Sequence, residues 1–275
     1  MILNASVIDL SKPIVMGILN VTPDSFHDGG KYISKETILE RALQIKNEGA
    51  TIIDIGAYSS RPGAIDISVE EELERLLPAI EIIKKNIPNY PISVDTFRSK
   101  VVKTLVSNFG DLIVNDISAG ELDNEMPNIV GELQLPYICM HMRGTPQTMQ
   151  NFTEYQDLVS DVLQYFAVKV KAFRKAGIKD IICDPGFGFS KTIDQNFELL
   201  CKLDTLKLLE VPILAGLSRK SMIWKTLEIK PSEALNGTTA LNMVALQKGA
   251  KILRVHDVKE AVETIALFEK LNIWK

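Results

Sequence analysis

The chain has 275 residues, 46% hydrophobic and 24% charged, which is an ordinary globular composition with enough chain for a large core. The formal net charge of −4 argues against a general binder of nucleic acid or of membrane surfaces, because both need a basic face. No apolar run approaches the roughly 20 residues of a membrane span, and the N-terminus shows no signal-peptide pattern. A cytoplasmic protein is therefore expected. Cys139, Cys183 and Cys201 lack metal-ligand spacing and are expected to be reduced thiols.

The chain repeats one pattern eight times, namely an apolar strand, a polar residue where it ends, a loop and a helix. Residues 1–13 precede this pattern and are expected to form an arm, with a small strand pair that plugs the bottom of the fold. The predicted strands are 14–20, 51–55, 91–94, 112–114, 137–140, 180–183, 212–215 and 251–255. The first predicted helix begins after Ser34-Lys-Glu-Thr37 and stops at Gly49. The others are 68–86 with a capping box at Ser68-Val-Glu-Glu71, a segment from about 98, 125–134, 154–176, 194–208, 219–228, 232–248 and 258–271.

Eight strands alternating with helices, with short turns on one side and long loops on the other, predict a (β/α)₈ TIM barrel. We expect one domain over residues 1–275. The competing fold is a doubly wound sheet, which a G-x-G-x-x-G motif after an early strand would favour. Gly186-Phe-Gly188 follows a late strand and lacks the third glycine, so the barrel is favoured.

Polar or glycine residues stand where the predicted strands end. In a barrel of this kind the carboxyl ends of the strands form the reactive face. Because side chains alternate along a strand, Arg254 and His256 point the same way, and so do Ser93 and Asp95. The polar groups are therefore expected to converge on one pocket at the mouth. The strand-end residues are Asn20, Gly56, Asp95, Asn115, His141, Asp184, Gly216 and Arg254 with His256.

One part of this set suits a flat heterocycle. Asp95, Asn115 and Asp184, with Lys220 nearby, offer acceptors and donors for a ring with amide and amine edges. A carboxylate can accept paired N–H bonds from a 2-amino-4-oxo ring.

A second part suits an anion. Arg254, His256 and Arg61, with Asn20 and Ser60, gather positive charge and donors fit for a phosphate or diphosphate. Asn20 also supplies an oxygen ligand for a Mg²⁺ ion that keeps most of its waters.

An aromatic-sized subsite is expected between Phe187, Phe189, Pro62 and the aliphatic stem of Lys220.

Plainer roles exist for these residues. Asp95 could cap the following helix, and Asn20 and Asn115 could bond turn backbones. His141 is expected to be a satisfied buried histidine outside the site, and Met140-His-Met142 reads as core packing. These roles do not explain why the polar groups coincide on one face of an acidic chain.

The chain resembles the dihydropteroate synthases, the folate-pathway enzymes, along nearly its whole length. Eight segments in order make the resemblance specific. They are Met16-Gly-Ile-Leu-Asn-Val-Thr-Pro-Asp-Ser-Phe26 with Asp28-Gly-Gly30, Ser60-Arg-Pro-Gly-Ala64, Ser93-Val-Asp-Thr96, Val114-Asn-Asp-Ile117, Met140-His-Met142, Asp184-Pro-Gly-Phe-Gly-Phe189, Ser218-Arg-Lys-Ser221 and Arg254-Val-His256.

The resemblance implies a transferase that condenses (7,8-dihydropterin-6-yl)methyl diphosphate with 4-aminobenzoate, giving 7,8-dihydropteroate and diphosphate. It also implies Mg²⁺, a homodimer formed through the last helices, and sulfonamides as competitors of 4-aminobenzoate. The loss of diphosphate is expected to precede attack by the amine.

The resemblance assigns roles to single residues. By likeness, the catalytic set is Asp95, Lys220, Arg254, His256 and Arg61. The pterin would be held by Asp95, Asn115, Asp184 and Lys220, in a slot lined by Met140 and Gly216. Asn20 would touch Mg²⁺, and the diphosphate would be met by Ser60, Arg61, Arg254, Val255 and His256. The aminobenzoate subsite would be shaped by Pro62, Phe189 and Ser221.

The chain departs from the family pattern in the loop Gly56-Ala-Tyr-Ser-Ser-Arg-Pro-Gly63. The family commonly reads Gly-Gly-Glu-Ser-Thr-Arg-Pro-Gly, so Tyr58 replaces an acid and Ser60 lacks a methyl group. Ser190 stands where glycine is common.

Two other functions remain as alternatives, and a third is disfavoured. A pterin-binding methyltransferase that serves a corrinoid protein has no use for a diphosphate clamp, which Arg61, Arg254 and His256 would form. A pterin-binding protein with a structural role should have lost a member of the site. A Schiff-base aldolase is disfavoured because no lysine stands at the inner end of a strand.

Overall fold

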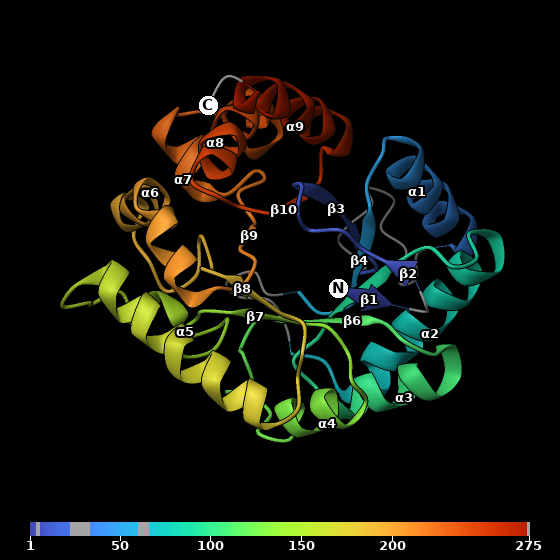
Figure 1. Ribbon diagram of the computed structural model, residues 1–275. Coiled ribbons are helices and arrows are strands. Elements are labelled where there is room, and N and C mark those ends of the chain that lie inside the picture. Colours follow the sequence, from blue (N-terminus) through green and yellow to red (C-terminus); the bar gives the residue numbers. More distant parts are fainter. Residues whose placement is uncertain (4–5, 23–33, 60–65, 274–275) are drawn as a thin grey trace.

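The computed structural model describes residues 1–3, 6–22, 34–59 and 66–273, and its centre is an eight-stranded parallel sheet (Figure 1). The strands are β3 (Ile14–Asn20), β4 (Ile52–Gly56), β5 (Ile92–Asp95), β6 (Ile113–Asp116), β7 (Tyr137–Met140), β8 (Ile181–Asp184), β9 (Leu214–Ala215) and β10 (Ile252–Val255). Their order is β8-β7-β6-β5-β4-β3-β10-β9, and a bridge between Cys183 and Ile213 joins the two ends. The sheet thus closes into the predicted (β/α)₈ barrel, which confirms that fold and excludes the doubly wound sheet.

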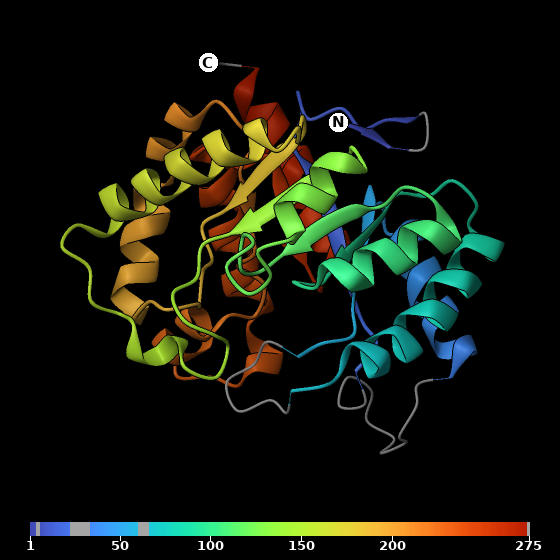
Figure 2. The same ribbon diagram turned by 90° about the horizontal axis from the view of Figure 1, so that it is seen from below.

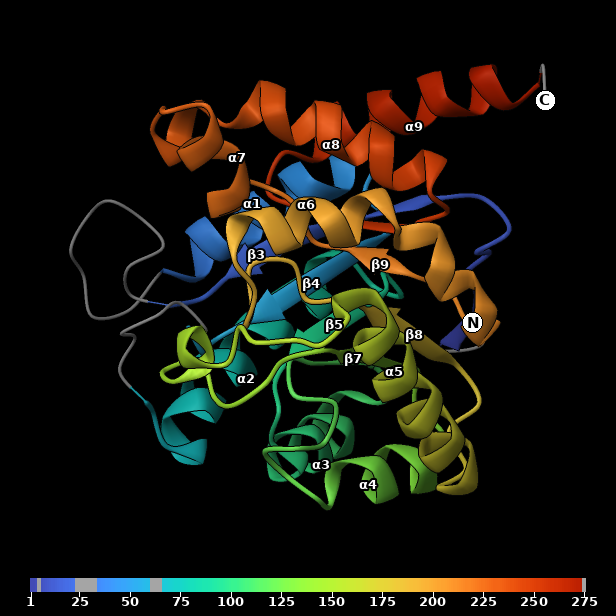
Figure 3. The ribbon, with the colours of Figure 1, turned by 90° about the vertical axis from the view of Figure 1, so that its left-hand side faces the viewer.

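Helices surround the barrel on all sides (Figures 1 and 3). They are α1 (Lys35–Asn47), α2 (Val69–Asn86), α3 (Ser99–Phe109), α4 (Met126–Glu132), α5 (Leu158–Lys175), α6 (Ile193–Cys201), α7 (Ser221–Thr226), α8 (Leu235–Gln247) and α9 (Val258–Asn272), with 3₁₀ turns η2 (Met149–Asn151), η3 (Leu203–Leu209) and η4 (Pro231–Glu233). In the described part of the chain, none of these helices combines the length and the apolar character that a membrane crossing needs.

Helix boundaries differ from the prediction where side chains cap or break a helix. The helix predicted over 154–176 begins only at Leu158, because the Asp157 side chain accepts a hydrogen bond from the Ser160 N–H. The helix predicted over 194–208 divides into α6 and η3, since the backbone of Lys202 leaves the helical region.

The capping box predicted at Ser68 is only half formed. Ser68 Oγ accepts from the Glu71 N–H, but the Glu71 carboxylate pairs with Arg75 instead.

The N-terminal segment forms a short antiparallel hairpin of β1 (Ile2–Leu3) and β2 (Ser6–Val7). Leu3 and Ile8 are buried against side chains that fill the lower barrel interior. Figure 2 shows the hairpin at one end of the barrel. This is the strand pair expected from the first 13 residues.

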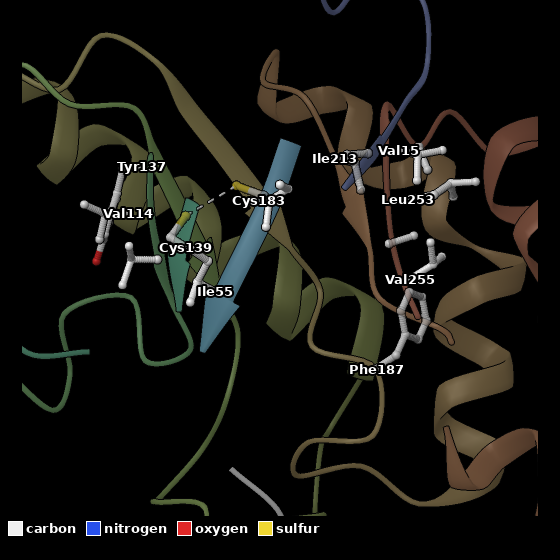
Figure 4. Close-up of a cluster of buried hydrophobic side chains, with 14 of the residues drawn as sticks. Val15, Ile55, Val114, Tyr137, Cys139, Cys183, Phe187, Ile213, Leu253 and Val255 are labelled. Atoms are coloured by element: carbon white, nitrogen blue, oxygen red, sulfur yellow. Dashed lines mark hydrogen bonds between the residues drawn. The ribbon is translucent and has the colours of Figure 1, made fainter. Parts of the chain in front are cut away.

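The apolar core has two parts, separated by the barrel wall. Inward-facing aliphatic side chains close the lower end of the barrel, and we call them the lower layer. The lower layer consists of Met16, Ile52, Ile113, Ile138, Ile182, Leu214 and Ile252. Alternate residues on the same strands face outward and pack against the helices, and Figure 4 labels several of them. Cys139 and Cys183 belong to this outer part and are free thiols, whereas Cys201 is free and exposed.

Candidate active site

A polar layer lies inside the barrel one step beyond the lower layer, toward the carboxyl ends of the strands. Residues two apart on a strand face the same side, so each polar side chain stands above an inward-facing residue of its own strand. We call this set the upper layer, and its members are Asp54, Asp95, Asn115, Asp184 and Arg254.

Arg254 connects the carboxylates of the upper layer. Its Nε lies 2.6 Å from Asp54 Oδ2, and its Nη2 lies 2.7 Å from Asp95 Oδ2. The Asn115 amide donates to Asp54 Oδ2 at 3.1 Å. Four strands are therefore tied together by one network at the mouth.

This network replaces two of the plainer roles. Asp95 does not cap the helix that follows, because α3 begins after Arg98 without a side-chain cap. The Asn115 amide donates to a carboxylate rather than serving a turn. The helix-cap role for Asp95 and the turn role for Asn115 are therefore wrong.

Burial tunes the charges of this network. It raises the pKa of Asp95 to about 7; Arg254 opposes the shift, and the charge of Asp54 adds to it. Burial alone would lower the pKa of Arg254, but Asp54 and Asp95 hold it above the ordinary value. Arg254 is thus a permanent cation, whereas Asp95 takes up a proton far more readily than an exposed aspartate.

Asp184 and Lys220 form the second charged part of the mouth. Asp184 Oδ1 accepts from the Gly186 N–H at 2.8 Å, and the Lys220 ammonium lies 4.4 Å from the centre of the Phe189 ring. Burial lowers the pKa of Lys220 to about 8 against the attraction of Asp184. Burial raises the pKa of Asp184, while the Gly186 N–H, Lys220 and then Arg254 lower it. The field of Arg254 therefore reaches Asp184, as expected for groups that share one mouth.

His256 corrects part of the prediction. It was expected to add positive charge, but burial, and after it the charge of nearby Arg254, lowers the pKa of His256 to about 4. A histidine with this pKa is neutral at pH 7 and is a hydrogen-bond donor rather than a cation. Its Nδ1 lies 3.1 Å from Ser218 Oγ, which also accepts from the His256 backbone N–H at 3.2 Å.

The apolar wall of the mouth contains two of the predicted residues. Met140 and Phe189 are buried in one cluster with Ile117, Met142 and Met149.

Two other residues do not point into the mouth. Phe187 and Val255 lie in the outer core between barrel and helices (Figure 4), so the prediction that the Phe187 ring walls a subsite is wrong. Only the backbone of Val255 is left to meet a ligand, because its side chain is fully buried there.

Two further predicted residues stand in the segment from the end of β9 to the start of α7, which also contains Lys220. Gly216 follows β9, and a side-chain carbon added to it would lie 3.9 Å from Asp184 Oδ2. Ser221 is the first residue of α7 and is half-buried.

The loop after β4 carries three predicted residues, Ser60, Arg61 and Pro62, which lie outside the described residues. Tyr58, just before them, packs its ring edge-on against Phe97 at 5.0 Å and accepts from Gln147 Nε2 at 3.1 Å. The residue that departs from the family pattern thus links this loop to the segment after β7.

The residues present fit a Mg²⁺ ion that is shared with a substrate. The Asn20 side-chain oxygen lies 3.6 Å from where a Cβ on Gly56 would stand, so the glycine leaves room beside it. Asp54 Oδ1 is buried with no hydrogen-bond partner among the described residues. Within those residues no group of three His, Cys, Asp or Glu could form a metal cage. Mg²⁺ commonly needs only one or two protein oxygens when phosphates and water complete its shell, and the Asn20 side chain offers such an oxygen.

Sequence reasoning missed two residues of the site, Asp54 of the network and Ser218 beside His256. Asp54 stands in the run Ile52-Ile-Asp-Ile55, where a charge within a buried strand signals a partner across the barrel. Ser218 follows β9 in a segment already singled out, but its hydrogen bond to His256 spans 38 residues.

A closed (β/α)₈ barrel with carboxylates, an amide and two cations at its carboxyl end is the architecture of an enzyme with a small polar substrate. Residues 16–256 match the family described as "Pterin binding enzyme". The dihydropteroate synthase of Escherichia coli K12 is 44% identical over 264 residues, covering 95% of this chain and 93% of that protein. The chain therefore belongs to the pterin binding enzymes, in the family of the dihydropteroate synthases.

Solved structures agree with this assignment. The Yersinia pestis dihydropteroate synthase, in a complex with a sulfonamide drug, superposes with a TM-score of 0.92 at 38% identity, covering 99% of this chain and 98% of that one. The Xanthomonas albilineans dihydropteroate synthase with 4-aminobenzoic acid superposes with a TM-score of 0.90 at 37% identity, covering 98% of this chain and 96% of that one.

Proposed function

We propose that this enzyme condenses (7,8-dihydropterin-6-yl)methyl diphosphate with 4-aminobenzoate, giving 7,8-dihydropteroate and diphosphate. The observation that carries the proposal is the upper layer, in which Arg254 and the carboxylates of Asp54, Asp95 and Asp184 share one mouth. The relatives with the same barrel support it, because their structures hold a sulfonamide drug or 4-aminobenzoic acid.

In this proposal Asp95, Asn115, Asp184 and Lys220 bind the pterin. Asp184 and Asp95 accept from its N–H edge, and Lys220 donates to its oxo and ring-nitrogen edge. The raised pKa of both carboxyls means that burial destabilises their charged forms, and hydrogen bonds from paired N–H donors of the pterin would stabilise them.

Arg254 and His256 bind the diphosphate. Arg254 Nη2 and Nε are occupied by carboxylates, so the guanidinium is oriented before substrate arrives. Ser218 accepts from the His256 backbone and donates its own proton to Nδ1, which leaves the imidazole proton on Nε2 for a phosphate oxygen. Arg61 and Ser60 are expected to add donors from the loop after β4.

The chemistry we propose is dissociative. The bond between the pterin methylene carbon and the diphosphate oxygen breaks first, and its electron pair leaves with diphosphate. The cation that remains is delocalised into the ring and is stabilised by the Asp95 carboxylate. The amine lone pair of 4-aminobenzoate then forms the new C–N bond, beside Phe189, Ser221 and Pro62, and the nitrogen loses one proton to the released diphosphate. A bound Mg²⁺ held by Asn20 would neutralise charge on the diphosphate oxygens.

The decisive experiment measures diphosphate release from the pterin substrate with and without 4-aminobenzoate. Release that requires the arylamine and yields dihydropteroate supports the proposal. A methyltransferase or a non-catalytic pterin-binding protein would give no such release. Sulfonamide should raise the KM for 4-aminobenzoate without lowering kcat.

Two variants test the roles of single residues. Lys220→Ala is expected to weaken pterin binding at least tenfold in calorimetry, because the donor to the ring is lost. Asp95→Asn is expected to lower kcat at least a hundredfold with a smaller change in pterin affinity. An unchanged rate at unchanged affinity would remove Asp95 from the proposed role.

The metal proposal has its own test. Asn20→Ala should weaken Mg²⁺-dependent binding of diphosphate in calorimetry and leave metal-free pterin binding unchanged. If diphosphate binds equally well with and without Mg²⁺, the ion is not part of the site.

We further propose a cytoplasmic homodimer formed through the last helices. The exposed Leu267 and Leu271 of α9 support a buried interface there. Sedimentation of the protein with Leu267→Lys and Leu271→Lys should show a shift from dimer to monomer, and a wild-type monomer would contradict this proposal.

A further inference from the structure

Lys191 is a buried lysine that the proposed reaction does not use. The residue comes just after the turn that follows β8, and it is 4% exposed. Burial of an ammonium group is costly unless each N–H finds an acceptor. Lys191 is therefore expected to have a defined task in the fold.

The ammonium has exactly as many acceptors as it has N–H groups. It donates to the backbone oxygens of Gly186 at 3.1 Å and Phe189 at 3.0 Å, and its third contact is His141 Nδ1 at 3.0 Å. In its charged form Lys191 can only donate, so His141 Nδ1 accepts from it, and the imidazole proton then lies on Nε2. The three bonds fasten the turn after β8 to the end of β7.

The same turn is connected at one end to the Asp184 carboxylate and carries the Phe189 ring at the other end. The Gly186 carbonyl accepts from Lys191 while the Gly186 N–H donates to Asp184 Oδ1. The Phe189 carbonyl also accepts from Lys191, while the Phe189 ring lies under the Lys220 ammonium. Lys191 is thus linked to Asp184 through the backbone of one residue, Gly186, and to the Phe189 ring through the carbonyl of Phe189 itself.

We infer that Lys191 is a positioning residue for the pterin: it holds the turn 185–189 in the conformation that aims the Asp184 carboxylate and the Phe189 ring into the mouth. The inference rests on the proposed function, since Asp184 and Phe189 are assigned to substrate there. Lys191 itself touches no reacting atom.

Packing on both sides of the turn agrees with this role. A side-chain carbon at Gly186 would collide with the His141 backbone oxygen, so the turn approaches β7 as closely as a backbone can. From the other side, Asn196 of α6 accepts from the Gly188 N–H at 2.6 Å. Removing the Lys191 bonds would take the printed donor from the Phe189 carbonyl and from His141 Nδ1, whereas the Gly186 carbonyl would keep the Phe189 N–H at 3.1 Å.

Electrostatics couples Lys191 to the same carboxylate. Burial lowers the pKa of Lys191 to about 7, Asp184 opposes the shift, and Lys220 and Arg143 add to it. In turn, Lys191 is one of the cations that lower the pKa of Asp184. Loss of Lys191 would therefore make the Asp184 anion harder to maintain as well as harder to orient.

The test compares Lys191→Met with Lys84→Met. Methionine keeps the length of the side chain and removes the ammonium. Lys84 is a matched control because it also donates to a distant backbone oxygen, that of Phe109, but at the amino ends of the strands. Both variants are assayed well below their unfolding temperatures, and calorimetry uses 6-hydroxymethyl-7,8-dihydropterin and inorganic diphosphate as separate probes.

We expect Lys191→Met to weaken pterin binding at least tenfold and to raise the KM for the pterin substrate equally, with kcat within threefold. Diphosphate binding should stay within twofold, because the hydrogen bonds of Arg254 and His256 among the described residues go to Asp54, Asp95 and Ser218 and not to the turn. Lys84→Met should leave both affinities unchanged.

The outcomes separate the two proposals. Equal pterin affinities for Lys191→Met and wild type, or equal losses for pterin and diphosphate, would overturn the positioning role. If Lys191→Met does not fold, Ser190→Ala tests the same turn, since Ser190 Oγ accepts from the Arg143 N–H at 3.1 Å and that variant should lose pterin affinity selectively. A wild-type enzyme that binds no pterin would instead defeat the proposed function.

Discussion

The lower and upper layers of the barrel interior are built on the same strands, two residues apart, yet they differ completely in chemistry. Ile52, Ile182 and Ile252 fill the lower layer, while Asp54, Asp184 and Arg254 follow them in the upper layer. Aliphatic side chains stabilise a barrel by removing apolar surface from water. Buried carboxylates and a guanidinium are costly and persist only when they are paired. The lower layer therefore stabilises the fold, and this stability offsets the cost of burying the charged side chains that form the binding site in the upper layer.

The strongest test of this comparison removes the central cation. Arg254→Met leaves the Asp54 and Asp95 carboxyls without their partner, which should cost about 3–5 kcal/mol of unfolding free energy. Activity should fall at least a hundredfold, because the diphosphate donor is lost. Urea denaturation and steady-state kinetics measure the two effects.

A double variant separates stability from function. Arg254→Met with Asp54→Asn should recover much of the stability, since one uncompensated charge is gone, and recover none of the activity. A single variant as stable as wild type would mean that the network does not hold the upper layer together.

The neutral histidine predicts a pH effect. The pKa of His256 is about 4 in the folded protein and near 6.5 when unfolded, so between these values the unfolded chain binds the additional proton. The contribution of neutral His256 to the unfolding free energy is fully present above the pKa of the unfolded chain, and it is lost as the pH falls toward 4. Between pH 4.5 and 6, the unfolding free energy of wild type should lose up to about 1.4 kcal/mol per pH unit more than that of His256→Gln. Parallel curves for the two proteins would show that His256 is protonated in the fold.

The lower layer should respond in stability alone. Ile182→Val removes one buried methylene group and should cost about 1 kcal/mol, with kcat/KM within twofold of wild type. Asp184→Asn, two residues further on, is the matched comparison and should instead weaken pterin binding at least tenfold. If Ile182→Val also weakens pterin binding, the two layers are not independent.

An exposed ion pair gives the smallest effect. Lys35 and Glu81 lie 3.4 Å apart with side chains 54% and 65% exposed, so water screens their attraction. Lys35→Gln should change the unfolding free energy by less than about 0.5 kcal/mol. A loss as large as that of Arg254→Met would contradict the view that burial makes the upper-layer pairs costly to break.

Much of the fold was predictable because its signals are local. Each strand is a short apolar run, each is followed by a polar residue or glycine, and the Ser68 cap begins a helix where predicted. Boundaries failed where a later side chain intervened, as at Asp157 and Lys202. Strand alternation also placed Arg254, Asp95 and Asp184 on the inner face.

The pairings inside the site were not predictable. Arg254 meets Asp54 across 200 residues of chain, and nothing near either residue indicates the other. The neutral state of His256 depends on burial and on a neighbouring cation, and the outward position of Phe187 depends on how its turn closes.

The sequence alone determined the barrel and the end of it that carries the chemistry, because hydrophobic periodicity and strand-end residues are properties of short segments. Only the tertiary structure decided which charges are paired, which histidine is neutral and how Lys191 holds its turn. Those properties depend on desolvation and on distances between segments far apart in the chain, and both come into existence when the barrel closes.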